Sequence, residues 1–408
     1  MAENNADGKR KKKERTIDFD RFPERRIALM FLYLGWEFEG MVLQPDTTNT
    51  TEEALLRALE KTKLIRSRAH ARWNRCGRTD KGVSGFRQVG SCVVRSTDIT
   101  GEHVRWPTAA EDGETAANRC SSTSELDFAK ILNAVLPPGV RVIAWAPVDF
   151  EFNARFNCRE RVYRYVFPQA NFDVQRMNDA VGRLVGEHDF RNFCQIDQCE
   201  RRLETSYVRR IHFAEIQPIS HDSSDPACSM HQLVVKGSGF LWHQIRFIAT
   251  LLFEIGVGNE EPTLISELLD IRRFPARPTF RMAKELPLCF FDCSYNVDLQ
   301  WKFEADGVRK VFRSLQRQWC ELRVKTEILH NMMRELGGMA AMPPDAEGIA
   351  DFVRDSQYNA KVHVPILKRP LLESLDSRIA RAAEKRARTG ESEPNGERNE
   401  DDAEPMDS

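Results

Sequence analysis

The 408-residue sequence contains no apolar run close to the roughly 20 residues that a membrane-spanning helix requires. Residues 1–15 are polar and basic, so we expect neither a membrane anchor nor a secretory signal. The ten cysteines are scattered, and the pairs Cys194/Cys199 and Cys289/Cys293 lack the close Cys and His spacing of a zinc site. We therefore expect reduced thiols in an intracellular protein and no metal site.

A large net charge is also lacking, but the near-zero value hides an uneven distribution. The whole chain has a formal charge of −1, whereas the last 19 residues hold eight acidic side chains and one arginine, which leaves +6 for residues 1–389. The basic cluster at residues 9–15 is typical of a nuclear-localisation signal or a phosphate-binding arm, or of a solubilising tail. A basic body with an acidic tail favours a protein that handles nucleic acid.

Asp80 lies in a short stretch, residues 75–85, that combines one carboxylate with three cations and three glycines. One interpretation is a turn between two strands, in which Asp80 bonds its own backbone and Gly82 takes a positive φ. The other is a site, because Arg78 beside the carboxylate favours the ionised form that a nucleophile or base requires.

Basic residues alternate just before this stretch. A period of two predicts a strand with Arg66, Arg68, His70 and Arg72 on one face and Trp73 with small residues on the other. A row of cations that leads to an Asp-bearing loop suits a polyanionic ligand.

The motif Gly77-Arg78-Thr79-Asp80-x-Gly82-Val83 resembles the central motif of the TruA-type tRNA pseudouridine synthases. The longer form, residues 75–84, is most similar to the eukaryotic 38/39 branch, although Gly85-Phe86-Arg87 stands where that branch more often has Ala-Phe-Gly. The resemblance extends over residues 27–295 and into residues 371–379. Its further motifs are Gly35 to Gly40, Asn153-Ala154-Arg155-Phe156 with Tyr163-Arg164-Tyr165, Gly186 to Phe190, Phe240 to Arg246, and Leu286-Pro287-Leu288.

The resemblance implies a role for each matching residue. Asp80 is the catalytic carboxylate, Tyr163 lies over the target base, and Leu288 lies beneath it; taken alone, Tyr163 and Leu288 also fit ordinary strand and core positions. Arg246 is the one cation in an apolar run, so it is expected to have an anionic partner, and the resemblance implies Asp80. Arg78 would hold a phosphate or fill the space of a flipped nucleotide. The residues expected to contact RNA phosphates are Arg66, Arg68, Arg72, Arg75, Lys81, Arg155, Arg161 and Arg164.

The implied fold is α/β of the α+β type, with two similar halves whose mixed, largely antiparallel sheets join into one large sheet around the active cleft. We divide the chain into a basic tail (1–24), a first half (25–95), a flexible insertion (96–124), a second half (125–296), a helical extension (297–380) and an acidic tail (381–408). Periodicity predicts helices from residue 50, over 126–136, 174–185, 239–256, 262–271 and 307–336, and a last strand over 283–293.

The resulting hypothesis is an isomerase that converts uridine to pseudouridine in the tRNA anticodon stem-loop, at position 38, 39 or both. The base and sugar stay in the RNA, so no cofactor is expected. The resemblance also implies a homodimer, and the basic cluster suggests a nuclear and cytoplasmic location. Two alternatives stay open: a related synthase that acts elsewhere on RNA, and an inactive tRNA-binding protein. A glycosidase is distant, since the sequence offers no second carboxylate in a comparable setting.

Overall fold

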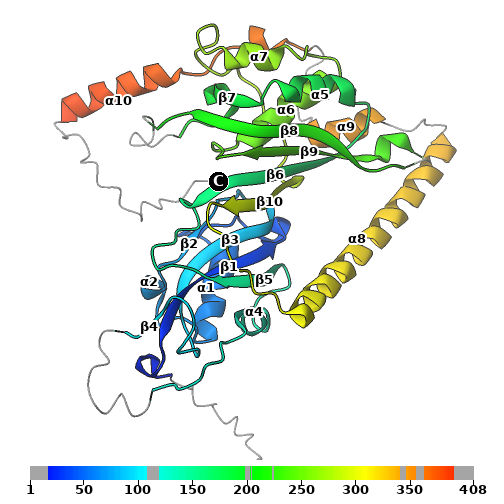
Figure 1. Cartoon of the computed structure of the whole chain (residues 1–408). Helices are drawn as coiled ribbons and strands as arrows, with labels where there is room; N and C mark the ends of the chain where they lie inside the picture. Colours follow the sequence, from blue (N-terminus) through cyan, green and yellow to red (C-terminus); the bar gives the residue numbers. More distant parts are fainter. Residues whose placement is uncertain are drawn as a thin grey trace, which may run out of the picture.

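A mixed sheet of 10 strands runs through the whole molecule, in the order β4-β1-β3-β10-β6-β9-β8-β7, with β2 paired to β3 and β5 paired to β1 (Figure 1). The computed structural model describes residues 17–107, 119–197, 203, 205–222, 225–340, 346–354 and 363–389. The basic cluster at residues 9–15 and the acidic end of the chain lie outside these ranges. The α/β fold expected from the sequence is confirmed, with two helix-covered halves joined in one sheet.

The first half folds around the buried strand β1. Its elements are η1 (Phe19–Arg21), β1 (Glu24–Tyr33), η2 (Gly35–Glu37), α1 (Thr51–Lys61), α2 (Arg68–Ala71), β2 (Asn74–Arg75), β3 (Ser84–Arg95), β4 (Val104–Arg105), α4 (Phe128–Asn133) and β5 (Val140–Pro147). Helix α1 begins as expected, because the Thr50 hydroxyl accepts a hydrogen bond from the Glu53 N–H at 3.2 Å. Its leucines pack with α4 against one face of β1, which forms the first core.

The second half repeats the plan of strands covered by helices. Its elements are β6 (Cys158–Pro168), α5 (Val174–Gly182), β7 (Gly186–Asp189), η3 (Arg191–Phe193), β8 (Val208–Ser220), η5 (Pro226–Cys228), β9 (Met230–Gly237), α6 (Gln244–Gly256), α7 (Leu264–Leu269) and β10 (Leu288–Tyr295). Helices α5, α6 and α7 lie on the same side of the sheet (Figure 1). Helix α6 is buried along almost its whole length and forms the centre of the second core.

The two halves meet along a short seam between β3 and β10. These strands pair in parallel at only two positions, Cys289 with Ser84 and Phe290 with Gly85. Strand β10 then pairs antiparallel with β6, so the first half reaches the second through β10. A third apolar cluster, which includes Val89, Phe152 and Phe290, packs across this seam.

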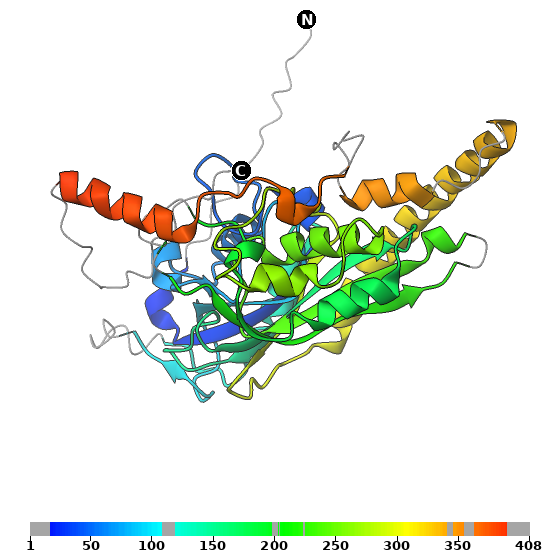
Figure 2. The same cartoon turned by 90° about the horizontal axis from the view of Figure 1, so that it is seen from above.

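The C-terminal extension consists of α8 (Ala305–Ala340), α9 (Ala346–Arg354), η6 (Ile366–Lys368) and α10 (Leu375–Thr389). Helix α9 and η6 return to the second half, where Ala350, Val353 and Ile366 are fully buried. Helices α8 and α10 project from opposite sides of the body (Figure 1, Figure 2). Along α8, only Val311 is buried among the described side chains.

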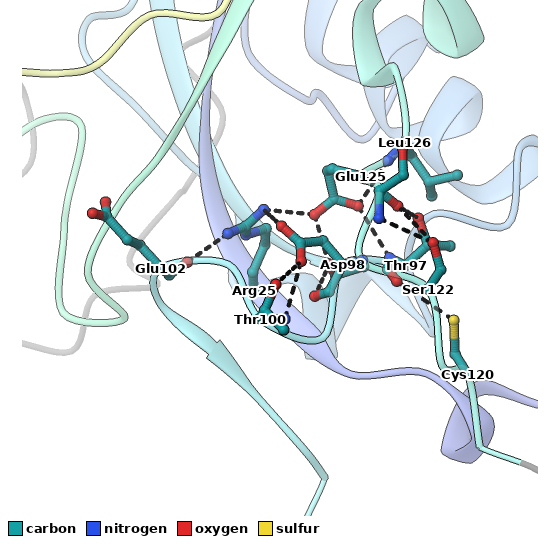
Figure 3. Close-up of polar contacts among 11 residues, drawn as sticks. Arg25, Thr97, Asp98, Thr100, Glu102, Cys120, Ser122, Glu125 and Leu126 are labelled. Carbon is teal, nitrogen blue, oxygen red and sulfur yellow. Dashed lines mark hydrogen bonds and ion pairs between the residues drawn. The ribbon is translucent and has the colours of Figure 1, made fainter.

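The two ends of the insertion at residues 96–124 are joined by a polar cluster around Arg25 (Figure 3). The Arg25 guanidinium lies 2.7 Å from Glu125 and donates to the Glu102 carbonyl at 2.6 Å. Glu125 also accepts hydrogen bonds from the Ser96 hydroxyl and the Thr97 N–H. The described ends of the insertion are therefore fixed to β1, while residues 108–118 lie outside the described ranges.

Several predicted elements are wrong in type or length. The alternating stretch at residues 66–73 is not a strand: Ser67 caps the short helix α2, and Arg72 ends it in a left-handed conformation with φ of 47°. Helix α5 stops at Gly182, and the predicted helix of residues 239–256 begins only at Gln244. The last strand begins at Leu288, five residues later than predicted.

Candidate active site

The loop between β2 and β3 presents Asp80, and it has the turn geometry expected from its sequence. The Asp80 carbonyl accepts a hydrogen bond from the Val83 N–H at 3.2 Å, and Gly82 has a φ of 78°, so the segment is a turn. The side-chain amide of Gln88 accepts a hydrogen bond from the Gly77 N–H at 3.2 Å and donates one to the Gly77 carbonyl at 3.0 Å. The Thr79 hydroxyl lies 2.8 Å from the buried Tyr33 hydroxyl. These contacts fix the backbone on both sides of Asp80.

The carboxylate of Asp80 points across the seam at the start of α6. Its Oδ2 lies 3.3 Å from His243 Nε2 and 3.6 Å from the Arg246 guanidinium. The Asp80 side chain is 23% exposed, so the carboxylate is largely enclosed and still open to a ligand. The structure thus brings Asp80 and Arg246 together from the two halves, as the resemblance implied.

The surroundings favour the ionised form of Asp80. Burial by itself raises the pKa of a carboxyl group, but here the hydrogen bond from His243 and the charges of His243 and Arg246 outweigh it. The pKa of Asp80 therefore lies below its ordinary value. At neutral pH the loop presents a carboxylate rather than a carboxylic acid.

Two further contacts hold the Arg246 side chain in place. Its Nε donates to the Ala283 carbonyl at 2.8 Å, and a terminal nitrogen lies 2.9 Å from Glu285. Both partners belong to the segment before β10. A guanidinium with fixed acceptors on three sides has one orientation, which suits the binding of one carboxylate oxygen.

Tyr163 lies on β6, close to the Asp80 loop. Its ring makes edge-to-face contacts with Phe240 and Phe290, at centroid distances of 5.1 and 5.4 Å. A Cβ on Gly77 would lie 3.9 Å from the Tyr163 hydroxyl and 3.1 Å from the Phe290 ring, so a glycine allows this close approach. Burial raises the pKa of Tyr163, which keeps its phenol protonated.

Leu288 and Arg78, the other two predicted substrate-binding residues, take different positions. Leu288 is buried at the first position of β10, opposite Tyr165 on β6, and belongs to the second core. Arg78 lies half-buried in the Asp80 loop, two residues before the carboxylate.

The predicted RNA-binding residues fall into two groups. Three arginines near α2 are paired with carboxylates of the first half: Arg66 with Asp20 at 2.6 Å, Arg68 with Glu53 at 2.7 Å, and Arg75 with Glu52 at 2.9 Å. The predicted basic face is therefore largely neutralised by residues distant in sequence, and Arg72 lies exposed at the end of α2.

The second group lies near the seam. Lys81 is 66% exposed beside Asp80 and pairs with the exposed carboxylate of Glu39 at 2.5 Å. Arg155 stacks on the exposed Phe156 ring. The Arg161 guanidinium donates to the carbonyls of Cys76 and Arg155 at 3.0 and 2.9 Å, which ties that turn to the Asp80 loop. Arg164 stacks on the Phe291 ring at 3.4 Å.

Sequence reasoning assigned no role to His243, the closest partner of the Asp80 carboxylate. His243 lies within the motif Phe240 to Arg246, three residues before Arg246, and this spacing is the signal that the sequence offers. Among the described residues, no group of three His, Cys, Asp or Glu side chains is placed to hold a metal. Within the same ranges, no helix has the length and apolar character needed to cross a membrane.

Comparisons with known proteins show the family of this chain. A family model described as tRNA pseudouridine synthase matches residues 180–296. A probable tRNA pseudouridine synthase of Caenorhabditis elegans is 43% identical, over 93% of this chain and 95% of the relative. The tRNA pseudouridine(38/39) synthase of Bos taurus is 37% identical, over 92% and 80% of the two chains, and that of Homo sapiens is 36% identical, over 90% and 79%. The chain belongs to the tRNA pseudouridine synthase family, whose members are isomerases that convert uridine to pseudouridine.

Proposed function

We propose that this chain forms pseudouridine in the anticodon stem-loop of tRNA, at position 38, 39 or both, with Asp80 as the reacting carboxylate. The observation that carries the proposal is the ionised, partly open carboxylate held by His243 and Arg246. The relatives of Bos taurus and Homo sapiens that cover most of the chain are named for positions 38 and 39.

The reaction breaks the bond between C1′ and N1 of uridine and forms one between C1′ and C5. The proton on C5 is lost and N1 gains one, so the atoms balance without a cofactor. Asp80 acts either as a nucleophile toward the nucleoside or as a base at the sugar, and both roles require the ionised form. Tyr163, which stays protonated, stacks on the uracil and is suited to donate a proton rather than accept one.

RNA contact is proposed for the surface beside the loop. Lys81, Arg155 and Phe156 are exposed there, and an exposed aromatic next to cations suits an unstacked base in a single-stranded loop. Arg161 links this surface to the Asp80 loop. We expect Lys81→Ala and Arg155→Ala each to lower tRNA affinity and to reduce the salt dependence of binding.

A test of the reaction uses tRNA with tritium at uracil C5 and uridines at positions 38 and 39. We expect tritium release by the wild type and none by Asp80→Ala, followed by carbodiimide-dependent primer-extension stops at those positions. Asp189→Ala is the matched control, because Asp189 pairs with Arg191 at 2.8 Å outside the loop. Stops elsewhere would refute the position, and release by Asp80→Ala would refute the role of the carboxylate.

A homodimer is proposed on the basis of helix α8. Residues that are apolar except for Thr326 recur along it at alternating steps of four and three, the spacing of the contact stripe of a coiled coil. Most of these side chains are more than half exposed. This contact stripe of α8 consists of Val308, Phe312, Leu315, Trp319, Leu322, Thr326, Leu329, Met333, Leu336 and Ala340. Along the described side chains of α8, only Val311 is buried.

Light scattering during gel filtration tests the dimer. We expect twice the chain mass for the wild type and a monomer for Leu322→Glu with Leu329→Glu. Asn331→Glu, on the opposite face of α8, is expected to stay dimeric. A monomeric wild type would refute the dimer.

The nuclear and cytoplasmic location is proposed from the basic cluster at residues 9–15. Fluorescence microscopy of a tagged chain tests it, with a variant whose five lysines and arginines at residues 9–13 are replaced by alanine. We expect the nuclear fraction to fall in the variant, and an unchanged distribution would refute the signal.

A further inference from the structure

His243 has a strained backbone that places its ring against the reacting carboxylate. Its φ of 63° and ψ of 6° are left-handed, a conformation that few residues other than glycine adopt. Among the described residues, four other non-glycine residues have a positive φ: Lys63, Arg72, His103 and Ala170. Only the strain at His243 lies at the site, and strain that a fold maintains at a site points to a function.

The turn before α6 is built to keep this conformation. The Gln244 side chain, which is buried, accepts a hydrogen bond from the Leu241 N–H at 2.8 Å. The Trp242 carbonyl accepts from the Gln195 N–H at 3.1 Å, and the His243 carbonyl accepts from the N–H groups of Arg246 and Phe247 at 3.0 and 3.1 Å. The His243 ring is packed against Trp242, at a centroid distance of 4.5 Å. The ring therefore has little freedom to turn away from Asp80.

His243 and Arg246 make their closest approach to the same oxygen of Asp80, Oδ2. Arg246 supplies a permanent charge, and Glu285 with the Ala283 carbonyl fixes where that charge lies. Two donors on one oxygen fix the rotation of the carboxylate about its Cβ–Cγ bond. Neither donor makes its closest approach to the other oxygen, Oδ1.

We propose that His243 is a positioning residue: its Nε2–H donates to Oδ2 of Asp80 and, together with Arg246, turns Oδ1 toward the uridine. The proposal rests on the proposed role of Asp80. It requires a donor at this position and not a second charge, because Arg246 already provides one. A carboxylate that rotates freely would spend less time aligned with the reacting atom, so the chemical step would slow while RNA binding stays unchanged.

Single-turnover tritium release and tRNA binding separate these effects. We expect His243→Leu to lower the rate of the chemical step roughly 10- to 100-fold with tRNA affinity within about twofold of the wild type. His243→Gln, which keeps a donor and never carries a charge, should recover most of that rate. His243→Gly should be as slow as His243→Leu but melt at a higher temperature than it, because glycine relieves the strain.

The control is His363→Leu. His363 also bonds a carboxylate, Glu260, at 2.8 Å, but in the C-terminal extension. It should lose stability and keep the wild-type rate. A wild-type rate in His243→Leu, a loss in tRNA affinity alone, or no recovery in His243→Gln would overturn the proposal.

A double-mutant cycle in the free protein separates this proposal from the role of Asp80. Asp80→Asn, His243→Leu and the double variant are compared by denaturant midpoint. We expect the two changes to be non-additive, because the two side chains touch. Additive shifts would overturn the contact between His243 and Asp80 even if Asp80 proves catalytic. Tritium release by Asp80→Ala would instead refute the proposed role of Asp80.

Discussion

Arg246→Met is the substitution whose effect follows most directly from the geometry. The Arg246 guanidinium lies 3.6 Å from Asp80, and at an effective dielectric constant of about 20 such a pair is worth about 4 to 5 kcal/mol. Glu285 neutralises part of the arginine charge, and His243 still holds Asp80 in the variant. We therefore expect the ionised form of Asp80 to lose roughly 2 kcal/mol of stabilisation.

The sign of the pH effect follows from the lowered pKa of Asp80 in the wild type. Removal of Arg246 raises that pKa, so a larger fraction of Asp80 is protonated and inactive as the pH falls. A loss of about 2 kcal/mol corresponds to a roughly 30-fold change in that equilibrium. We expect the ratio of wild-type to variant rate to grow by about this factor between neutral and acidic pH.

The assay is single-turnover tritium release across the pH range in which both proteins stay folded. Arg354→Met is the matched control, because Arg354 pairs with Glu254 of the same helix α6 at 3.0 Å, outside the site. Its pH–rate profile should superimpose on that of the wild type. A rate ratio for Arg246→Met that is constant with pH would refute the electrostatic role and leave Arg246 a role in orientation alone.

Three further predictions concern the loop and its neighbours. Folding lowers the pKa of Asp80, so the ionised carboxylate stabilises the fold above the unfolded-chain pKa of about 3.9. As the pH drops below that value, the melting temperature of the wild type should fall relative to that of Asp80→Asn. Gly82→Ala places a Cβ 2.7 Å from the Glu285 side chain at a φ of 78°, whereas Gly258→Ala has a φ of 84° and no neighbour within 4 Å. Both should lose roughly 1 kcal/mol of stability in denaturant titrations, and only Gly82→Ala should lose activity; equal activities would contradict the packing argument. Tyr163→Phe should keep tRNA affinity and slow product formation, and an unaffected rate would leave Tyr163 a stacking role only.

A residue of the candidate site was predictable from the sequence where its immediate neighbours in the chain mark it. Asp80 and Arg246 stand out locally, one as a carboxylate among glycines and the other as a cation in an apolar run. The fold class was predicted from the resemblance to the TruA-type synthases. His243 did not stand out, because its role depends on a left-handed turn before α6 that no residue type in that turn signals.

The stretch at residues 66–73 shows why alternation alone was misleading. A strand and a short helix compete there, and Ser67 decides for the helix by accepting the His70 N–H at 3.1 Å. Its arginines then pair with carboxylates such as Glu53 and Glu24, which lie on other elements. Partners brought together by tertiary structure are not visible in a local pattern.

The seam between β3 and β10 has a consequence for how the enzyme is made. Asp80 leaves the ribosome long before His243 and Arg246, and long before β10 can pair with Ser84 and Gly85. A nascent or truncated chain with only the first half therefore carries the loop without the donors that orient its carboxylate. Such fragments should modify no RNA, so the division of the site between two halves restricts catalysis to chains that include β10.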